Sequence, residues 1–315
     1  MVSLPRIYPW MQTFNRDLTR DDMRMRLRRL SEVLQAAIRG QTEVLERLAA
    51  AVTRMELGAV PPRGPRGVAV FAGTTGVGKT QSAMILAETL WGPGHLAIFD
   101  ASEHQNIASL PVLLGDRGGD RGQFGEAYLR VPHGVWLIDE IEKAHPQILQ
   151  LLLQMADAGR VTQANGKTLD LSRIYLILTT NLGSAEILGR EHLTFTSLER
   201  HVTRAVEQWL RPELLARLGA PYVFRPLSRE VQCEIAAQRL TALLDWQRQE
   251  GRQVVAAEGV LDLLMRRGFS PRLGARPLLQ ASDELVGNAI AAELLRGGSG
   301  CGTLTVVGDS LELVS

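Results

Sequence analysis

Up to residue 224, short apolar runs alternate with stretches in which apolar residues recur every third or fourth position. The runs predict buried strands, and the periodic stretches predict packed helices. The predicted strands are 68–72, 96–100, 134–140, 174–180 and 222–224, and the predicted helices are 19–37, 41–57, 81–91, 146–158 and 198–217. Two further short runs, 160–163 and 167–171, predict a hairpin that turns at Asn165-Gly166. Alternation of this kind predicts a three-layer α/β domain.

After Arg225 the pattern becomes mostly helical. The predicted helices there are 229–247, 257–267 and 277–295, and the alternating runs 303–307 and 310–314 predict a short β-hairpin at the end of the chain. We therefore expect three parts: an N-terminal arm with a helix (1–37), a large domain (38–224) and a small, mostly helical C-terminal domain (225–315).

The arm carries Tyr8, Trp10 and Phe14 without any helical or strand period. These rings would either dock on a partner or a neighbouring subunit, or fold back onto the chain's own surface.

Composition and net charge exclude only a few classes of protein and partner. The chain has 315 residues, 45% of them apolar, and a formal net charge of +1, which suits a globular protein of two domains. Its local basic run, 24–29, is explained as a solvated helix face, so we do not expect nucleic acid as a partner. No apolar stretch approaches the roughly 18 residues of a membrane span. The N-terminus lacks the apolar core of a secretory signal, so the cytoplasm is the expected location.

A phosphate-binding pattern follows the first strand of the predicted sheet. The stretch GTTGVGKT, Gly73 to Thr80, satisfies G-x-x-x-x-G-K-[ST] at every required position, between a predicted strand and a predicted helix. Backbone N–H groups of such a loop cradle phosphates, the lysine adds a mobile cation and the last hydroxyl binds Mg²⁺. The candidate nucleotide-binding residues are Thr74, Thr75, Gly76, Val77, Gly78, Lys79 and Thr80. The sequence therefore predicts a nucleoside triphosphate as ligand.

An acidic pair ends the apolar run 134–138. Asp139 and Glu140 stand where parallel sheets place their ligands, at the C-terminal edge. Asp139 is suited to the Mg²⁺ shell together with Thr80, and Glu140 to orienting the attacking water. Cys233, Cys301 and the six histidines show no metal-ligand spacing, so Mg²⁺ carried with the nucleotide is the metal we expect.

The order of motifs resembles the AAA+ ATPases, specifically the Clp-type protein unfoldases and the second ATPase module of ClpB and ClpA. Besides the two motifs above, the match rests on LIDEIEKAHPQILQLLLQMADAGRVT (137–162), TTNLGS (179–184), RPELLARLGAPYVFRPLS (211–228) and GFSPRLGARPL (268–278). It runs from about residue 38 to the C-terminus. The resemblance implies a P-loop AAA+ large domain followed by a small domain, with ATP and Mg²⁺ as ligands.

The resemblance also implies roles for single residues. Asn181 is similar to the polar sensor that places the attacking water, and Arg276 to the second sensor. Arg217 is similar to the arginine finger, which reaches into a neighbouring subunit's site. Ile38 and Arg39 resemble the segment that lines the adenine pocket, which favours ATP over GTP. A finger that acts in trans predicts a ring of subunits, most simply a hexamer.

One segment departs from the family. Clp unfoldases grip substrate with an aromatic pore loop, but the corresponding stretch here, Gly115 to Gly125, is shorter and contains a single aromatic, Phe124. We expect this Gly-rich, charged stretch to be a mobile surface loop that buries little. No Ile-Gly-Phe or Ile-Gly-Leu loop lies between Asn181 and Arg211, so docking on a ClpP-like protease is not supported.

Two classes of function therefore remain open. The first is a Clp-like ATPase that remodels or disassembles a protein partner. The second is an ATP-dependent assembly or switch within a larger machine, such as a secretion, defence or mobile-element system, without peptide threading. A nucleic-acid motor is a weaker third option because basic contacts are few.

Overall fold

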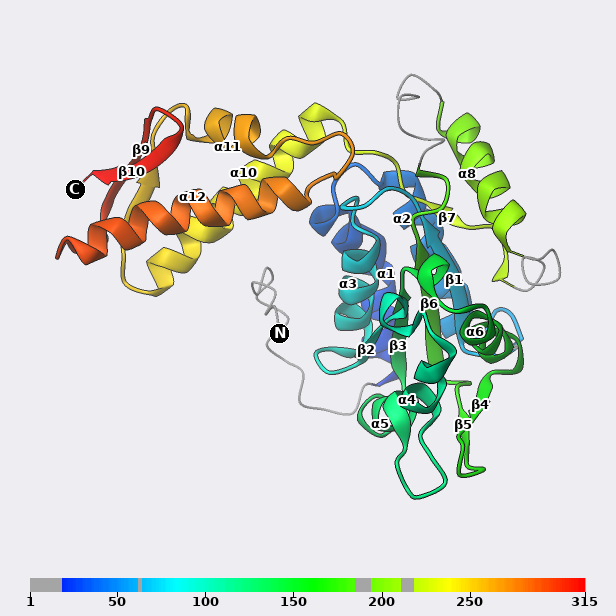
Figure 1. Cartoon of the computed structure of the whole chain (residues 1–315). Coiled ribbons are helices and arrows are strands. Elements are labelled where there is room, and N and C mark those ends of the chain that lie inside the picture. The colour runs from blue at the N-terminus through cyan, green and yellow to red at the C-terminus, as the bar shows by residue number, and fades with distance from the viewer. Residues whose placement is uncertain (1–18, 62–63, 185–193, 211–217, 315) are drawn as a thin grey trace. The chain divides into compact units, whose positions relative to one another are not determined.

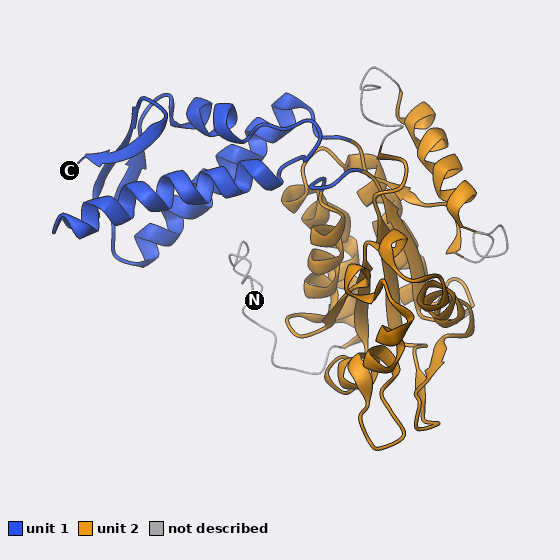
Figure 2. Ribbon diagram, in the orientation of Figure 1, with its two compact units in different colours: residues 1–7, 74–77, 226–315 blue, residues 8–73, 78–225 orange. Residues whose placement is uncertain are grey.

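The computed structural model describes residues 19–61, 64–184, 194–210 and 218–314. These form two compact units (Figure 2). The large unit comprises residues 19–73 and 78–225, and the C-terminal unit comprises the loop 74–77 and residues 226–314. Among the described residues, no helix combines the length and apolar character that a membrane span requires.

Helices and strands alternate along the large unit, as the apolar pattern predicts (Figure 1). Its helices are α1 (Arg20–Ala37), α2 (Thr42–Glu56), α3 (Lys79–Trp91), α4 (Leu110–Leu114), α5 (Gly122–Arg130), α6 (Pro146–Ala158) and α8 (Phe195–Trp209). Its strands are β1 (Gly67–Ala72), β2 (Leu96–Asp100), β3 (Gly134–Asp139), β4 (Arg160–Thr162), β5 (Thr168–Asp170), β6 (Ile174–Thr180) and β7 (Tyr222–Val223). β4 and β5 form the predicted antiparallel hairpin.

The central sheet has five parallel strands in the order β2-β3-β6-β1-β7. The register pairs Asp100 with Asp139, and Ala72 with Thr180, so the strand ends line up at one edge. Parallel strands that end together bring the loops that follow them to the same place. The loops after β1, β3 and β6, which carry the phosphate-binding pattern, Glu140 and Asn181, therefore start side by side.

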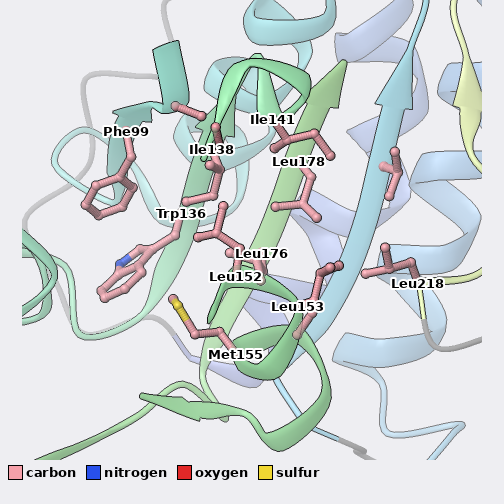
Figure 3. Packing of buried hydrophobic residues seen from close by; sticks show 14 of the residues in the cluster. Phe99, Trp136, Ile138, Ile141, Leu152, Leu153, Met155, Leu176, Leu178 and Leu218 are labelled. Carbon is pink, nitrogen blue, oxygen red and sulfur yellow. The ribbon is translucent and has the colours of Figure 1, made fainter. Parts of the chain in front are cut away.

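Both faces of this sheet are covered, which gives the expected three layers. Trp136 and Ile138 of β3 lie in one apolar cluster with Leu152 of α6 (Figure 3). Tyr175 and Ile177 of β6 face the opposite way and line a small apolar space with side chains of α2 and α3. Side chains alternate along a strand, so a sheet buried on both faces needs the continuous apolar runs seen in the sequence.

The prediction for Gly115 to Gly125 was wrong at its C-terminal end. Helix α5 begins at Gly122, and Phe124 is fully buried rather than exposed in a loop. Its ring lies 5.0 Å from that of Phe99 and 5.8 Å from that of Trp136, centroid to centroid. Within the segment 115–125, only residues 116–121 are exposed. Glycines on either side hid the helix, because an apolar face this short gives almost no periodic signal.

Phe124 should therefore matter for stability and not for gripping a substrate. We expect Phe124→Ala to lower the free energy of unfolding by roughly 3–5 kcal/mol, since a large ring leaves a cavity. Leu129→Ala, an exposed residue on the same helix, should change it by less than about 0.5 kcal/mol. Chemical denaturation of the two variants measures both values, and equal stabilities would contradict the burial of Phe124.

Helix α8 differs from its predicted span of 198–217. It begins at Phe195 and ends at Trp209, and the next residue, Leu210, is extended. Pro212 follows in the sequence, and a proline cannot donate the N–H that continues a helix.

The C-terminal unit is helical with a small sheet. Its helices are α10 (Arg229–Gln249), α11 (Val260–Gly268) and α12 (Arg276–Leu295), and its strands are β8 (Val254–Ala256), β9 (Gly302–Val307) and β10 (Ser310–Val314). β9 and β10 form the predicted hairpin. Strand β8 was not predicted; it pairs parallel to β9 and makes the sheet three-stranded. Three residues are too few to show a period of two.

Candidate nucleotide site

The loop after β1 has the backbone shape that a phosphate cradle needs. Gly76 and Gly78 have φ angles of 72° and 102°, in the left-handed region that favours glycine. Space is also short: a Cβ on Gly78 would lie 2.9 Å from the Cγ2 of Ile38, and one on Gly76 would lie 2.2 Å from the carbonyl oxygen of Leu273. The glycines of the motif are therefore required by conformation and by packing.

Lys79 is the first residue of α3, and its side chain reaches back to Gly73 at the start of the loop. Its side chain is buried, and Nζ donates to the carbonyl oxygen of Gly73 at 2.7 Å and to Oδ1 of Asn181 at 2.9 Å. The N-terminal end of α3 adds its own positive potential at the same place. A buried cation at the start of a helix, directly after a Gly-rich loop, is the arrangement that binds a polyphosphate.

Thr80 and Asp139 supply the oxygen atoms that Mg²⁺ prefers. The Thr80 hydroxyl donates to Oδ2 of Asp139 at 3.2 Å, and the Thr179 hydroxyl donates to Oδ1 of the same carboxylate. Among the described residues, no group of three or more His, Cys, Asp or Glu side chains could hold a metal alone. Because Mg²⁺ typically binds through one or two carboxylates together with phosphate oxygens, this pair fits a metal that arrives with the nucleotide.

Glu140 is held in an unusual conformation at the end of β3. Within the described chain it is the one non-glycine residue with a left-handed φ, 55°, which costs about 1–3 kcal/mol and is typical of functional positions. Its backbone N–H donates to the Thr179 hydroxyl at 3.0 Å. Its carboxylate accepts hydrogen bonds from Asn181 Nδ2 at 3.3 Å and from Lys143. The bond to Glu140, followed by the attraction of its charge, raises the pKa of Lys143.

Asn181 follows β6 and joins the two halves of the site. Its Oδ1 accepts from Lys79 of the phosphate loop, while its Nδ2 donates to Glu140. The structure therefore brings Lys79, Thr80, Asp139, Glu140 and Asn181 together, all within the large unit. Sequence reasoning missed Thr179, Glu142 and Lys143, which contact these residues. The signal that could have found them was their position inside the two motifs that carry Glu140 and Asn181.

The segment expected to line the adenine pocket lies beside the loop. Ile38 is buried against Gly78, and Arg39 is half-buried. Two residues on, the buried Gln41 side chain exchanges two 2.9 Å hydrogen bonds with the backbone of Arg225, where the large unit ends. An apolar side chain next to the phosphate loop suits the face of a base.

The tip of the loop, residues 74–77, belongs to the C-terminal unit. Within that unit the backbone N–H of Ala275 donates to the Gly76 carbonyl oxygen at 3.0 Å. Arg276 is the exposed first residue of α12. Arg217, the predicted finger, lies outside the described residues.

Comparison with known proteins decides the family. Residues 64–220 match the AAA domain (Cdc48 subfamily), and residues 225–306 match the C-terminal, D2-small domain of ClpB protein. The chain belongs to the Clp family of AAA+ ATPases. The predicted family and fold class are thereby confirmed.

Individual relatives agree with this assignment. Chaperone protein ClpB of Vibrio vulnificus (strain YJ016) is 36% identical over 279 residues, which cover 86% of this chain and 33% of that protein. Heat shock protein 100 of Trypanosoma brucei brucei is 36% identical over 263 residues, covering 81% of this chain and 30% of that protein. A closed-state cryo-EM reconstruction of Hsp104 with ATPγS and FITC-casein is similar with a TM-score of 0.82 and 30% identity, covering 94% of this chain and 53% of that chain. This Clp-family chain thus spans about a third of the length of its curated relatives.

Proposed function

We propose that this chain hydrolyses ATP in a ring of its own copies and couples the nucleotide cycle to remodelling or disassembly of a protein partner. The observation that carries the proposal is the Asn181 bridge between Lys79 and Glu140. It joins a phosphate-binding cation, a water-orienting carboxylate and a polar sensor in one network. Phosphoryl transfer depends mostly on such positioning and electrostatic stabilisation.

In the proposed mechanism Lys79 exchanges its contact with Gly73 for phosphate oxygens of ATP and keeps its hydrogen bond to Asn181. Thr80 and Asp139 would hold Mg²⁺, which neutralises charge on those oxygens. Glu140 and Asn181 then place a water molecule whose oxygen attacks the γ-phosphorus. The bond between that phosphorus and the ADP oxygen breaks, and Glu140 takes up a proton from the water.

The remaining residues extend this site. Ile38 and Arg39 would line the adenine pocket, which favours ATP over GTP. Residues 74–78 would cradle the phosphates through their N–H groups. Arg276 would act as the second sensor from the small domain (225–315), and its support is the contact of neighbouring Ala275 with the loop tip. Arg217 would complete a neighbouring subunit's site as the arginine finger.

The ring, which we propose to be a hexamer, makes a specific kinetic prediction. Arg217→Ala and Glu140→Gln should each be inactive alone, but a mixture should regain activity. A mixed interface can combine Glu140 from one subunit with Arg217 from the next. Random mixing should restore about a quarter of the wild-type rate, since roughly one neighbouring pair in four has the right order. Steady-state ATPase assays of the separate and mixed variants test this, and a mixture that stays inactive would exclude a shared site.

Action on a protein substrate can be tested with FITC-casein, which is present with the similar Hsp104. We expect the Glu140→Gln variant with ATP to raise the fluorescence anisotropy of FITC-casein, because the ATP state persists without turnover. Lys79→Ala under the same conditions is the control and should leave the anisotropy unchanged. Equal, low anisotropy for both variants would contradict binding of an unfolded polypeptide.

One structural observation favours the second candidate, an assembly or switch ATPase that does not thread peptide. With Phe124 buried in the core, the exposed stretch 116–121 (DRGGDR) contains no aromatic side chain. A loop without aromatics lacks the usual means of gripping a polypeptide chain. If the wild type hydrolyses ATP and the mixed variants regain ATPase activity, but FITC-casein does not bind, the result would support this candidate.

A further inference from the structure

Glu142 contacts the sensor Asn181 at two points. It lies in the short 3₁₀ helix η4 (Ile141–Lys143), directly after Glu140. Its Oε1 accepts a 3.1 Å hydrogen bond from the backbone N–H of Asn181 and a 3.0 Å bond from Nδ2 of the same residue. Its other oxygen, Oε2, is buried and has no hydrogen-bond partner among the described residues. The carboxylate is thus turned toward Asn181 rather than toward water.

These contacts determine which way the Asn181 amide faces. Lys79 can only donate hydrogen bonds, whereas the carboxylates of Glu140 and Glu142 can only accept them. The amide must therefore present Oδ1 to Lys79 and Nδ2 to the two carboxylates. Of the two Nδ2 contacts, the one to Glu142 is shorter, at 3.0 Å against 3.3 Å to Glu140.

We propose that Glu142 is a positioning residue for ATP hydrolysis, which holds Asn181 in register between Lys79 and Glu140. The inference rests on the proposed function and deepens it. Glu142 fixes the main chain at the end of β6 through the Asn181 N–H, and fixes the side chain through Nδ2. Without it the amide keeps only its longer contact to Glu140, and the water that Asn181 helps to place loses its alignment. The phosphate-binding groups keep their geometry.

The test compares Glu142→Ala, Glu142→Gln, Asn181→Ala and the double variant Glu142→Ala/Asn181→Ala. Glu142→Ala should lower kcat for ATP roughly 10- to 100-fold, the range for loss of a charge-assisted hydrogen bond. The Kd for a fluorescent ADP analogue should not change. Glu142→Gln should retain most of kcat, because its carbonyl oxygen can still accept both bonds. In the Asn181→Ala background, Glu142→Ala should add little further loss, because the amide that Glu142 orients is gone and only the bond to the main-chain N–H of residue 181 remains.

The outcomes separate this inference from the function on which it rests. An active wild type with an equally active Glu142→Ala variant, or losses that multiply in the double variant, would overturn the inference alone. A wild type without ATPase activity would overturn the proposed function and this inference with it. If Glu142→Ala does not fold, Glu142→Asp replaces it: the shorter side chain falls short of Asn181 and should show the same selective loss of kcat.

Discussion

Replacing Glu140 with glutamine is expected to lower ATP turnover by roughly 100- to 10,000-fold while nucleotide stays bound. The amide keeps the size of the side chain, but it cannot take up a proton from water and has no negative charge with which to polarise it. The strained φ of 55° and the contacts with Asn181 and Lys143 show that the surrounding structure holds this carboxylate in place. Phosphate release measured at saturating ATP gives kcat, and titration with a fluorescent ATP analogue gives the affinity.

The control is Glu126→Gln, the same change at an exposed glutamate on α5. It should leave both kcat and affinity unchanged. Wild-type turnover in Glu140→Gln would remove Glu140 from the mechanism and point to another water-orienting group in the site.

Replacing Lys79 with alanine should instead weaken nucleotide binding itself, by about 100-fold. The reason is the loss of a buried ammonium group that would form charge-assisted hydrogen bonds to phosphate, each worth about 1.5–3 kcal/mol. Lys79 is only 7% exposed, so water cannot replace the ammonium group well. Isothermal titration with ATP measures the change directly.

Lys167→Ala provides the matched control, because Lys167 lies exposed in the turn between β4 and β5. Its removal should not alter the affinity. If Lys79→Ala binds ATP as tightly as Lys167→Ala does, the loop after β1 is not the phosphate site. The Glu140 and Lys79 variants together separate turnover from binding, which a single inactive variant cannot do.

Much of the large unit could be predicted from local pattern. The helix predicted at 146–158 is α6, which the structure places at Pro146–Ala158, and the run 174–180 is β6. In both segments the apolar residues that set the pattern are the residues that the fold buries, so the pattern is visible within the segment itself. The Gly73 to Thr80 loop was equally predictable. Its glycines are needed for the local backbone conformation, and its lysine supplies the cation within the same contiguous motif.

Other features depend on residues far apart in the chain. Phe124 looked like a loop aromatic because its neighbours are glycines, yet its ring is buried with Phe99 and Trp136. Strand β8 was missed because its three residues form a strand only by pairing with β9, whose residues lie nearly fifty positions later. Neither partner can be inferred from the segment itself.

The sequence by itself determined that the chain carries a phosphate loop, an acidic strand end and the motifs of a Clp-family ATPase, since each of these is a contiguous pattern. Only the tertiary structure decided how they meet. It placed Asn181 between Lys79 and Glu140, and brought Glu142 onto Asn181 from another strand end. The physical reason is the parallel register of the sheet, which gathers the ends of β1, β3 and β6 at one edge. Hydrogen bonds across that edge link residues about a hundred positions apart, as for Lys79 and Asn181, and no local period encodes them.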